Sequence, residues 1–158
     1  YSWNDTEYRD LHSTDANACS IGPLAQGYSQ HPLCTAQQDL SGNSFPFTPE
    51  HKLSLNLSYS WKLAGFDWEA TGSYLYTGKQ WATQYNHAQL DRVDSYHQWN
   101  ARLGLSLPRG EWQLIAFVDN LSDERAVTAH TRPAPTTHNR MSTVQRPRNY
   151  GLRLNYEF

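Results

Sequence analysis

Two carboxylates, Asp67 and Glu69, are separated by one residue in a stretch where polar and apolar residues alternate. In an extended strand, residues two positions apart point to the same face, so this pair could work as a general acid and a general base. Such catalysis also needs a pocket that moves the pKa values of the two carboxyls apart. We favour the simpler interpretation, that both carboxylates line a water-filled space.

Residues in the polar segments could contact a ligand. Three histidines, His87, His130 and His138, could bind iron or haem there, although scattered loop histidines are usually only solvated. Aromatic rings in these segments could stack on a sugar or a siderophore ring, or pack the loops against one another. The rings belong to Tyr28, Phe45, Phe47, Trp81 and Tyr85. As ligand contacts we predict Trp81, Tyr85 and His87.

Cys19 and Cys34 are the only cysteines, and the segment between them is rich in Gly, Pro, Ser and Gln. An even number of cysteines in a loop is typical of an oxidising compartment. A disulfide between them would contribute roughly 3 kcal/mol by restricting the unfolded chain. A metal site with His12 and His31 is the alternative, but the spacing matches no compact zinc pattern. We therefore predict the disulfide and no metal.

The rest of the sequence excludes several function classes. It contains no glycine-rich phosphate loop, no nucleophile elbow and no Cys-x-x-Cys motif, so we expect neither catalytic residues nor a cofactor, and no enzyme. The formal net charge of -2 provides no basic field for a phosphate backbone, which argues against nucleic acid as a partner. No apolar run approaches the ~20 residues of a membrane-spanning helix.

The strongest pattern along the chain is a strict alternation of apolar and polar residues, which indicates strands with one apolar face. One of these strands is less clean, because Ile115 and Phe117 fall on its polar face. Residues 1–11 are predicted to form the upper part of one more strand. The apolar sets are Leu53, Leu55, Leu57, Tyr59 and Trp61; Phe66, Trp68, Ala70, Gly72, Tyr74 and Tyr76; His97, Trp99, Ala101, Leu103, Leu105 and Leu107; Trp112, Leu114, Ala116 and Val118; and Tyr150, Leu152, Leu154, Tyr156 and Phe158.

The connections between these strands alternate in length. Long ones cover residues 12–50, 78–94 and 121–147, and short turns cover residues 62–65 and 108–110. Bacterial outer-membrane barrels have long extracellular loops, short periplasmic turns and strands of ~9 to 11 residues. Aromatic residues near the turns and farther along the strands fit the two interfacial girdles of such barrels. We therefore predict an all-β fold, a membrane-spanning antiparallel β-barrel with its C-terminus in the periplasm.

Three segments carry a closer resemblance: FPFTPEHKL at 45–53, FVDNLSDE at 117–124 and RPRNYGL at 146–152. They are similar to the closing segments of TonB-dependent outer-membrane receptors. The final strand also resembles the C-terminal signal that the barrel-assembly machinery reads in outer-membrane barrels. The residues of that signal would be Tyr150, Leu152, Leu154, Tyr156 and Phe158.

The resemblance implies a barrel of twenty-two strands around an N-terminal plug domain, with this chain, residues 1–158, forming about the last six strands. It implies import of a scarce nutrient, such as a ferric siderophore, across the outer membrane of a Gram-negative bacterium. The implied partners are the rest of the barrel and its plug, TonB through the missing N-terminal part, the barrel-assembly machinery, outer-membrane lipid and a small extracellular ligand. Residues expected to face plug or water are Lys52, Asn56, Glu69, Arg102, Arg153 and Asn155.

Because the sequence opens with neither an initiator Met nor a signal peptide, we expect it to start within a larger receptor, without the plug. Two other classes stay open at this point. One is a small outer-membrane barrel that does not use TonB, although such barrels start at eight strands. The other is a soluble secreted β-sandwich that binds carbohydrate through its loop aromatics.

Overall fold

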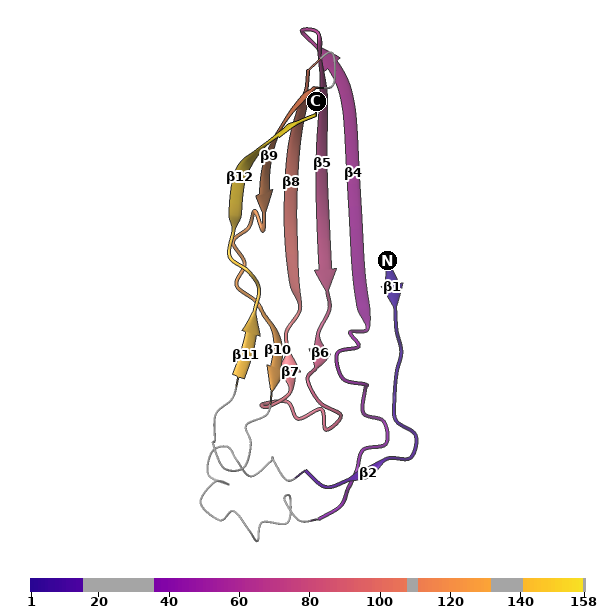
Figure 1. Ribbon diagram of the computed structural model, residues 1–158. Helices are drawn as coiled ribbons and strands as arrows, with labels where there is room; N and C mark the ends of the chain where they lie inside the picture. The colour runs from indigo at the N-terminus through magenta and orange to yellow at the C-terminus, as the bar shows by residue number, and fades with distance from the viewer. Residues whose placement is uncertain (16–35, 108–110, 132–140, 158) are drawn as a thin grey trace.

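A computed structural model describes residues 1–15, 36–107, 111–131 and 141–157. These residues form an antiparallel sheet of six strands in the order β1-β4-β5-β8-β9-β12, which is also their order along the chain (Figure 1). The strands are β1 (Ser2–Trp3), β4 (His51–Leu63), β5 (Phe66–Thr77), β8 (Tyr96–Ser106), β9 (Trp112–Asp119) and β12 (Asn149–Tyr156). Within the described ranges, no helix is long and apolar enough to cross a membrane.

The hairpin between β4 and β5 shows how the sequence sets the register. Pairing runs without a shift from Lys52↔Thr77 to Leu63↔Phe66, which leaves a two-residue turn. In that turn φ is 54° at Ala64 and 81° at Gly65. Two consecutive positive φ values give the type I′ turn, whose twist matches that of paired strands. The predicted turn over 62–65 is therefore shorter, and β4 continues to Leu63.

The register places the paired residues of the five predicted apolar sets on one face of the sheet. A single row across the sheet contains Trp61, Trp68, Leu105, Leu114 and Leu154. The neighbouring row, on the opposite face, contains Ser60, Glu69, Gly104, Ile115 and Arg153. Because side chains alternate along a strand, a register shift of one residue between any two neighbouring strands would have put apolar and polar side chains on the same face. The predicted all-β antiparallel architecture with one apolar face is confirmed.

The two bulky apolar residues on the polar face of β9 are accommodated by glycines on the neighbouring strands. Ile115 pairs with Gly104, and Phe117 pairs with Gly151. A Cβ atom at Gly151 would lie only 3.1 Å from Cζ of Phe117, so the phenyl ring covers the glycine. An aromatic ring that shields a strand glycine supports the local pairing. The glycines of β8 and β12 thus leave space for the two bulky side chains that interrupt the apolar–polar alternation of β9.

The apolar face is not covered by any other described part of the chain. Leu57 is 72% exposed and Tyr150 is 76% exposed. The buried apolar side chains of the described residues belong to the long connections and not to the six-stranded sheet. They are Leu40, Ala82, Leu90 and Val93. An uncovered apolar surface of this kind marks a contact with another protein or with lipid.

Each long connection contains a two-stranded ribbon that the sequence did not predict. The ribbons are β2 (His12–Ser13) with β3 (Gln38–Asp39), β6 (Gln80–Trp81) with β7 (Arg92–Val93), and β10 (Val127–Thr131) with β11 (Met141–Val144). All three lie at one end of the sheet, which we call the loop end. The turn between β4 and β5 lies at the opposite end, which we call the turn end (Figure 1).

The predicted strand over residues 1–11 is wrong in length, because only Ser2–Trp3 pairs with β4. Residues 4–11 instead make isolated backbone hydrogen bonds to residues 40–50, including Asn4 N to Glu50 O (2.8 Å) and Tyr8 N to Asn43 O (2.9 Å). Pro46 and Pro49 in the opposing segment have no N–H to donate, so a regular ladder cannot form there. Most of the outer edge of β4 therefore has no pairing partner among the described residues. The outer edge of β12, the last strand of the sheet, has none among them either.

Candidate ligand site at the loop end

A pocket of about 150 Å³ lies where the ends of β1, β4 and β5 meet their long connections, and we call it the loop pocket. Glu50 lies just before β4 and Lys79 just after β5, and Oε1 of Glu50 lies 3.4 Å from Trp3 Nε1 and 3.6 Å from His51 Nε2. The lining residues of the pocket are Asn4, Asp5, Thr6, Ser44, Thr48, Glu50, Lys79 and Trp81.

Trp81 is the one predicted ligand residue in this lining. Its carbonyl accepts a hydrogen bond from Phe47 N (2.8 Å), and its pairing with Arg92 closes the β6–β7 ribbon. The ammonium of Lys79 lies 5.1 Å from the centre of the indole ring, a cation–π contact that fixes the ring from one side. The indole is thus held in place before any ligand arrives.

The other two predicted ligand residues hold the connections together. The hydroxyl of Tyr85 donates to Thr14 O (2.9 Å) and lies 3.0 Å from Ser13 Oγ, which joins the second long connection to the first. His87 begins a tight turn in which its N–H donates to Oδ2 of the buried Asp91 (2.9 Å). Tyr85 and His87 do not line the loop pocket.

Several other candidate residues have structural partners. Phe45 packs against Tyr8 with ring centroids 4.6 Å apart, and Nδ1 of His130 lies 2.9 Å from Ser142 Oγ across the β10–β11 ribbon. Asp67, of the predicted carboxylate pair, forms an ion pair with Lys62 (3.1 Å). In the described part of the chain, no group of three or more His, Cys, Asp or Glu residues could hold a metal ion. The candidates Cys19, Tyr28, His31, Cys34, His138 and Phe158 lie outside the described residues.

Asn120, inside the FVDNLSDE motif, is a hydrogen-bonding centre that sequence reasoning missed. It is only 2% exposed, with φ at 54°, and Nδ2 donates to Glu124 O (2.9 Å) and Arg146 O (2.8 Å). Its Oδ1 accepts from Glu124 N (3.1 Å). Asn120 therefore fastens the segment after β9 to the segment before β12. A positive φ and contacts this distant along the chain leave no periodic signal in the sequence.

A row of amide side chains joins this centre to the polar face of the sheet. Gln145 Nε2 donates to Gln98 Oε1 (3.2 Å), and Gln98 Nε2 donates to Asn100 Oδ1 (2.8 Å). Asn100 Nδ2 then donates to Ser73 Oγ (2.9 Å), while Asn100 Oδ1 also accepts from Asn120 N (3.0 Å). The third long connection is thus hydrogen-bonded to the wall formed by β5 and β8.

The carboxylate of Asp123 also belongs to this closing region. Its Oδ1 accepts from Arg148 N (2.9 Å), and this hydrogen bond, aided by the charges of Arg125 and Arg148, lowers the pKa of Asp123 below its ordinary value. A lowered folded-state pKa means that the ionised carboxylate stabilises the fold above the unfolded-state pKa near 4. This contribution is lost as the pH falls through the folded-state pKa.

We predict that Asp123→Asn lowers the urea midpoint of the full-length receptor at pH 6, and that its difference from wild type shrinks below about pH 4. Asparagine keeps an acceptor for Arg148 N, so the substitution removes mainly the charge. Glu7→Gln is the control, because the Glu7 side chain is exposed and has no ion pair among the described residues. A difference between Asp123→Asn and wild type that does not change with pH would contradict the assignment.

We predict that Tyr85→Phe loosens the contact between the first two long connections at a cost of about 1 kcal/mol, the usual worth of one hydrogen bond. Amide hydrogen exchange in residues 12–14 should become faster. Tyr59→Phe is the matched control, because the Tyr59 hydroxyl has no hydrogen-bond partner among the described residues. Unchanged exchange in residues 12–14 would show that the Tyr85 hydroxyl does not hold these segments.

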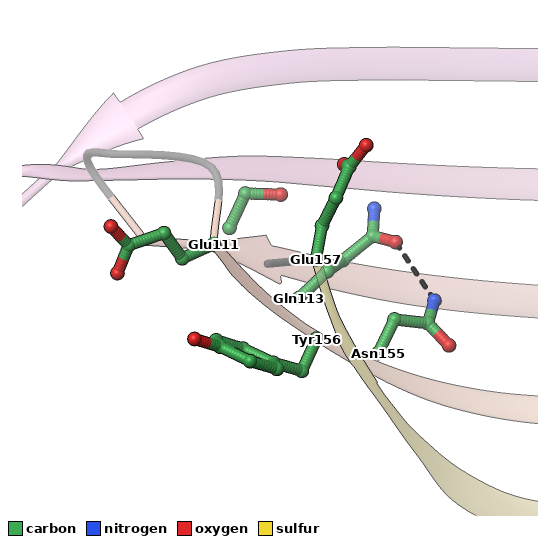
Figure 2. A pocket seen from close by; sticks show the side chains of 6 residues that line it. Glu111, Gln113, Asn155, Tyr156 and Glu157 are labelled. Atoms are coloured by element: carbon green, nitrogen blue, oxygen red, sulfur yellow. Dashed lines mark hydrogen bonds between the residues drawn. The ribbon is translucent and has the colours of Figure 1, made fainter.

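A second polar pocket lies at the turn end, between β8, β9 and the end of β12. Figure 2 shows Gln113 and Asn155 joined by a hydrogen bond of 3.1 Å, with the Tyr156 ring pointing away from them. That ring packs against Trp112 on the apolar face, with centroids 4.4 Å apart. The residues that line this second pocket are Ser106, Glu111, Gln113, Asn155, Tyr156 and Glu157.

Comparison with known proteins agrees with this architecture. A family model described as TonB dependent receptor-like, beta-barrel matches residues 1–121, which is more than half of the chain. No curated protein matches the chain. Members of that family are transporters of the outer membrane rather than enzymes. The chain therefore belongs to the TonB-dependent receptors, and its sheet is a segment of the larger β-barrel of such a receptor.

Proposed function

We propose that this chain forms about the last six strands of a TonB-dependent receptor that imports a scarce nutrient, such as a ferric siderophore. The observation that carries the proposal is the register, which segregates apolar and polar residues onto opposite faces of the sheet. In a transmembrane barrel the apolar face lies in lipid and the polar face lines the lumen. The lumen face would meet the plug and water.

The aromatic residues of the apolar face support this orientation. At the turn end, Trp61 stacks on Trp68 with centroids 6.0 Å apart, and toward the loop end Tyr74 contacts Trp99 at 4.3 Å. Between these two rows lie Leu57, Gly72 and Ala101, which are aligned with one another. Two aromatic rows that flank an apolar band are typical of outer-membrane barrels. The loop end would be extracellular, and the turn end and C-terminus periplasmic.

The same proposal assigns roles to the remaining parts of the chain. The exposed apolar residues of β12 would form the assembly signal, and TonB and the plug would act through the N-terminal part of the receptor. The Cys19–Cys34 disulfide would close the first extracellular loop. The signal residues are Tyr150, Leu152, Leu154, Tyr156 and Phe158, and the proposed ligand contacts are Trp81, Tyr85 and His87.

Uptake in cells tests this function. The full-length receptor is expressed in a Gram-negative strain without its own siderophore receptors, and uptake of radiolabelled ferric siderophores and other scarce nutrients is compared in tonB-positive and tonB-negative cells. We expect at least one nutrient to be taken up only with TonB. Equal uptake with and without TonB would refute the proposal.

Orientation is tested separately by cysteine labelling, with both native cysteines replaced by serine. A membrane-impermeant maleimide should label Ser41→Cys in intact cells, because Ser41 is exposed at the loop end. It should label Ala64→Cys in the β4–β5 turn only after the outer membrane is permeabilised. The reverse pattern would place the loop end in the periplasm.

A further inference from the structure

The charges in the loop pocket restrict the ligands that it can accept. Its lining contains two carboxylates, Asp5 and Glu50, and one ammonium, Lys79, for a net charge of one negative unit. Like charges brought together at a binding surface cost several kcal/mol, which disfavours an anionic ligand such as a ferric catecholate. A ligand cation on the Trp81 ring would be repelled by the Lys79 ammonium, which lies 5.1 Å from the ring centre. A neutral ligand remains.

The hydrogen-bonding groups of the loop pocket fit a ligand rich in hydroxyls. Asn4 Nδ2 is held by Pro49 O (3.4 Å) and Thr48 Oγ1 by Pro46 O (3.1 Å), so these side chains are positioned by the protein itself. The Asp5 carboxylate has no hydrogen-bond partner among the described residues and is exposed. A carboxylate accepts bonds from hydroxyls, an ammonium donates to them, and an indole packs against the apolar side of a ring.

The size of the loop pocket limits how much of the ligand enters. Pockets for drug-sized ligands have volumes of about 300 to 1,000 Å³, whereas this pocket has about 150 Å³. It can therefore enclose one ring, with the rest of a larger molecule lying outside. One aromatic ring among polar groups that both donate and accept is suited to a sugar ring, which has hydroxyls at its edge and C–H groups on its faces.

We propose that the loop pocket binds one sugar ring of a neutral oligosaccharide, rather than an anionic iron chelate. This inference rests on the proposed function, because it takes the loop pocket to lie at the extracellular mouth of the receptor. It narrows the nutrient to a neutral carbohydrate and gives Trp81 the role of stacking platform. Asp5 is the main acceptor for the ring hydroxyls. Glu50 offers its Oε2 as a second acceptor, because its Oε1 already lies 3.4 Å from Trp3 Nε1 and 3.6 Å from His51 Nε2.

The test uses the full-length receptor in detergent on an array of neutral and acidic oligosaccharides, together with a ferric tris-catecholate. We expect binding to neutral oligosaccharides, weakened at least about tenfold by Trp81→Ala. The double variant Asp5→Asn/Glu50→Gln should weaken it by a similar factor. Met141→Ala and Asp10→Asn are the controls, because both side chains are exposed and neither lines the loop pocket.

Absence of binding to every neutral oligosaccharide, with the receptor folded, would overturn the inference. Binding that is insensitive to Trp81→Ala would overturn it too. Uptake of the bound compound in tonB-positive and tonB-negative cells then separates the two proposals. Trp81-dependent, TonB-dependent uptake of the ferric tris-catecholate would refute the sugar assignment and leave the transport function standing. Uptake of a bound sugar without TonB would refute the transport function alone.

Discussion

Asn120→Ala should destabilise the full-length receptor by about 3 kcal/mol, because buried groups that lose their hydrogen-bond partners cost about 1 to 3 kcal/mol each. The substitution removes the donor to the carbonyls of Glu124 and Arg146 and the acceptor for Glu124 N. The connection between β9 and β12 should loosen as a result. The urea midpoint in detergent and hydrogen exchange in residues 120–126 measure the effect.

Asn120→Gly separates the two possible causes of this loss. Glycine adopts a positive φ without strain but lacks the amide group, and φ at Asn120 is 54°. If the hydrogen bonds dominate, Asn120→Gly should be almost as destabilising as Asn120→Ala. Wild-type stability of Asn120→Gly would show that the backbone conformation alone makes asparagine necessary.

Leu57→Arg should cost about 2 to 4 kcal/mol, the penalty for arginine on the lipid face near the middle of a barrel wall. Leu57 is 72% exposed and aligned with Gly72, between the two aromatic rows of the apolar face. In the intact receptor this exposure would be to hydrocarbon. Folding of the full-length receptor into lipid bilayers, followed by urea titration, measures the loss.

Ser58→Arg is the matched control for this substitution. Ser58 is the next residue along β4 and pairs with Thr71 on the polar face, so it lies at the same depth on the opposite side of the sheet. Arginine there would reach water in the lumen, and we expect a cost below about 1 kcal/mol. Equal losses for the two variants would argue against a lipid-facing apolar surface.

The strands were predictable from the sequence because alternation depends only on neighbouring residues. Leu53 to Trp61 follow a strict period of two, and the register confirms that this set shares a face with the apolar sets of the other long strands. The strand over 1–11 was predicted too long because the opposing Pro46 and Pro49 act across the sheet, not along the segment. The short ribbons have too few residues to display a period.

The loop pocket was only partly predictable. Trp81 stands out by its residue type, whereas Asp5 and Thr48 become neighbours only when the N-terminal segment folds beside the end of the first long connection. Tyr85 has an equally suggestive residue type, yet its hydroxyl is bonded to Thr14 O. Residue type alone cannot distinguish a ring that faces a pocket from one that joins two loops.

The central claim is that one face of this sheet lies in lipid and the other faces the lumen of an outer-membrane receptor. Nitroxide labels at each position from 53 to 60, in the full-length receptor in bilayers with both native cysteines replaced, measure it directly. We predict high collision rates with oxygen at odd positions and with a water-soluble nickel complex at even positions, because Leu53, Leu55, Leu57 and Tyr59 share the apolar face. Collision rates without a period of two, or with the opposite phase, would contradict the claim.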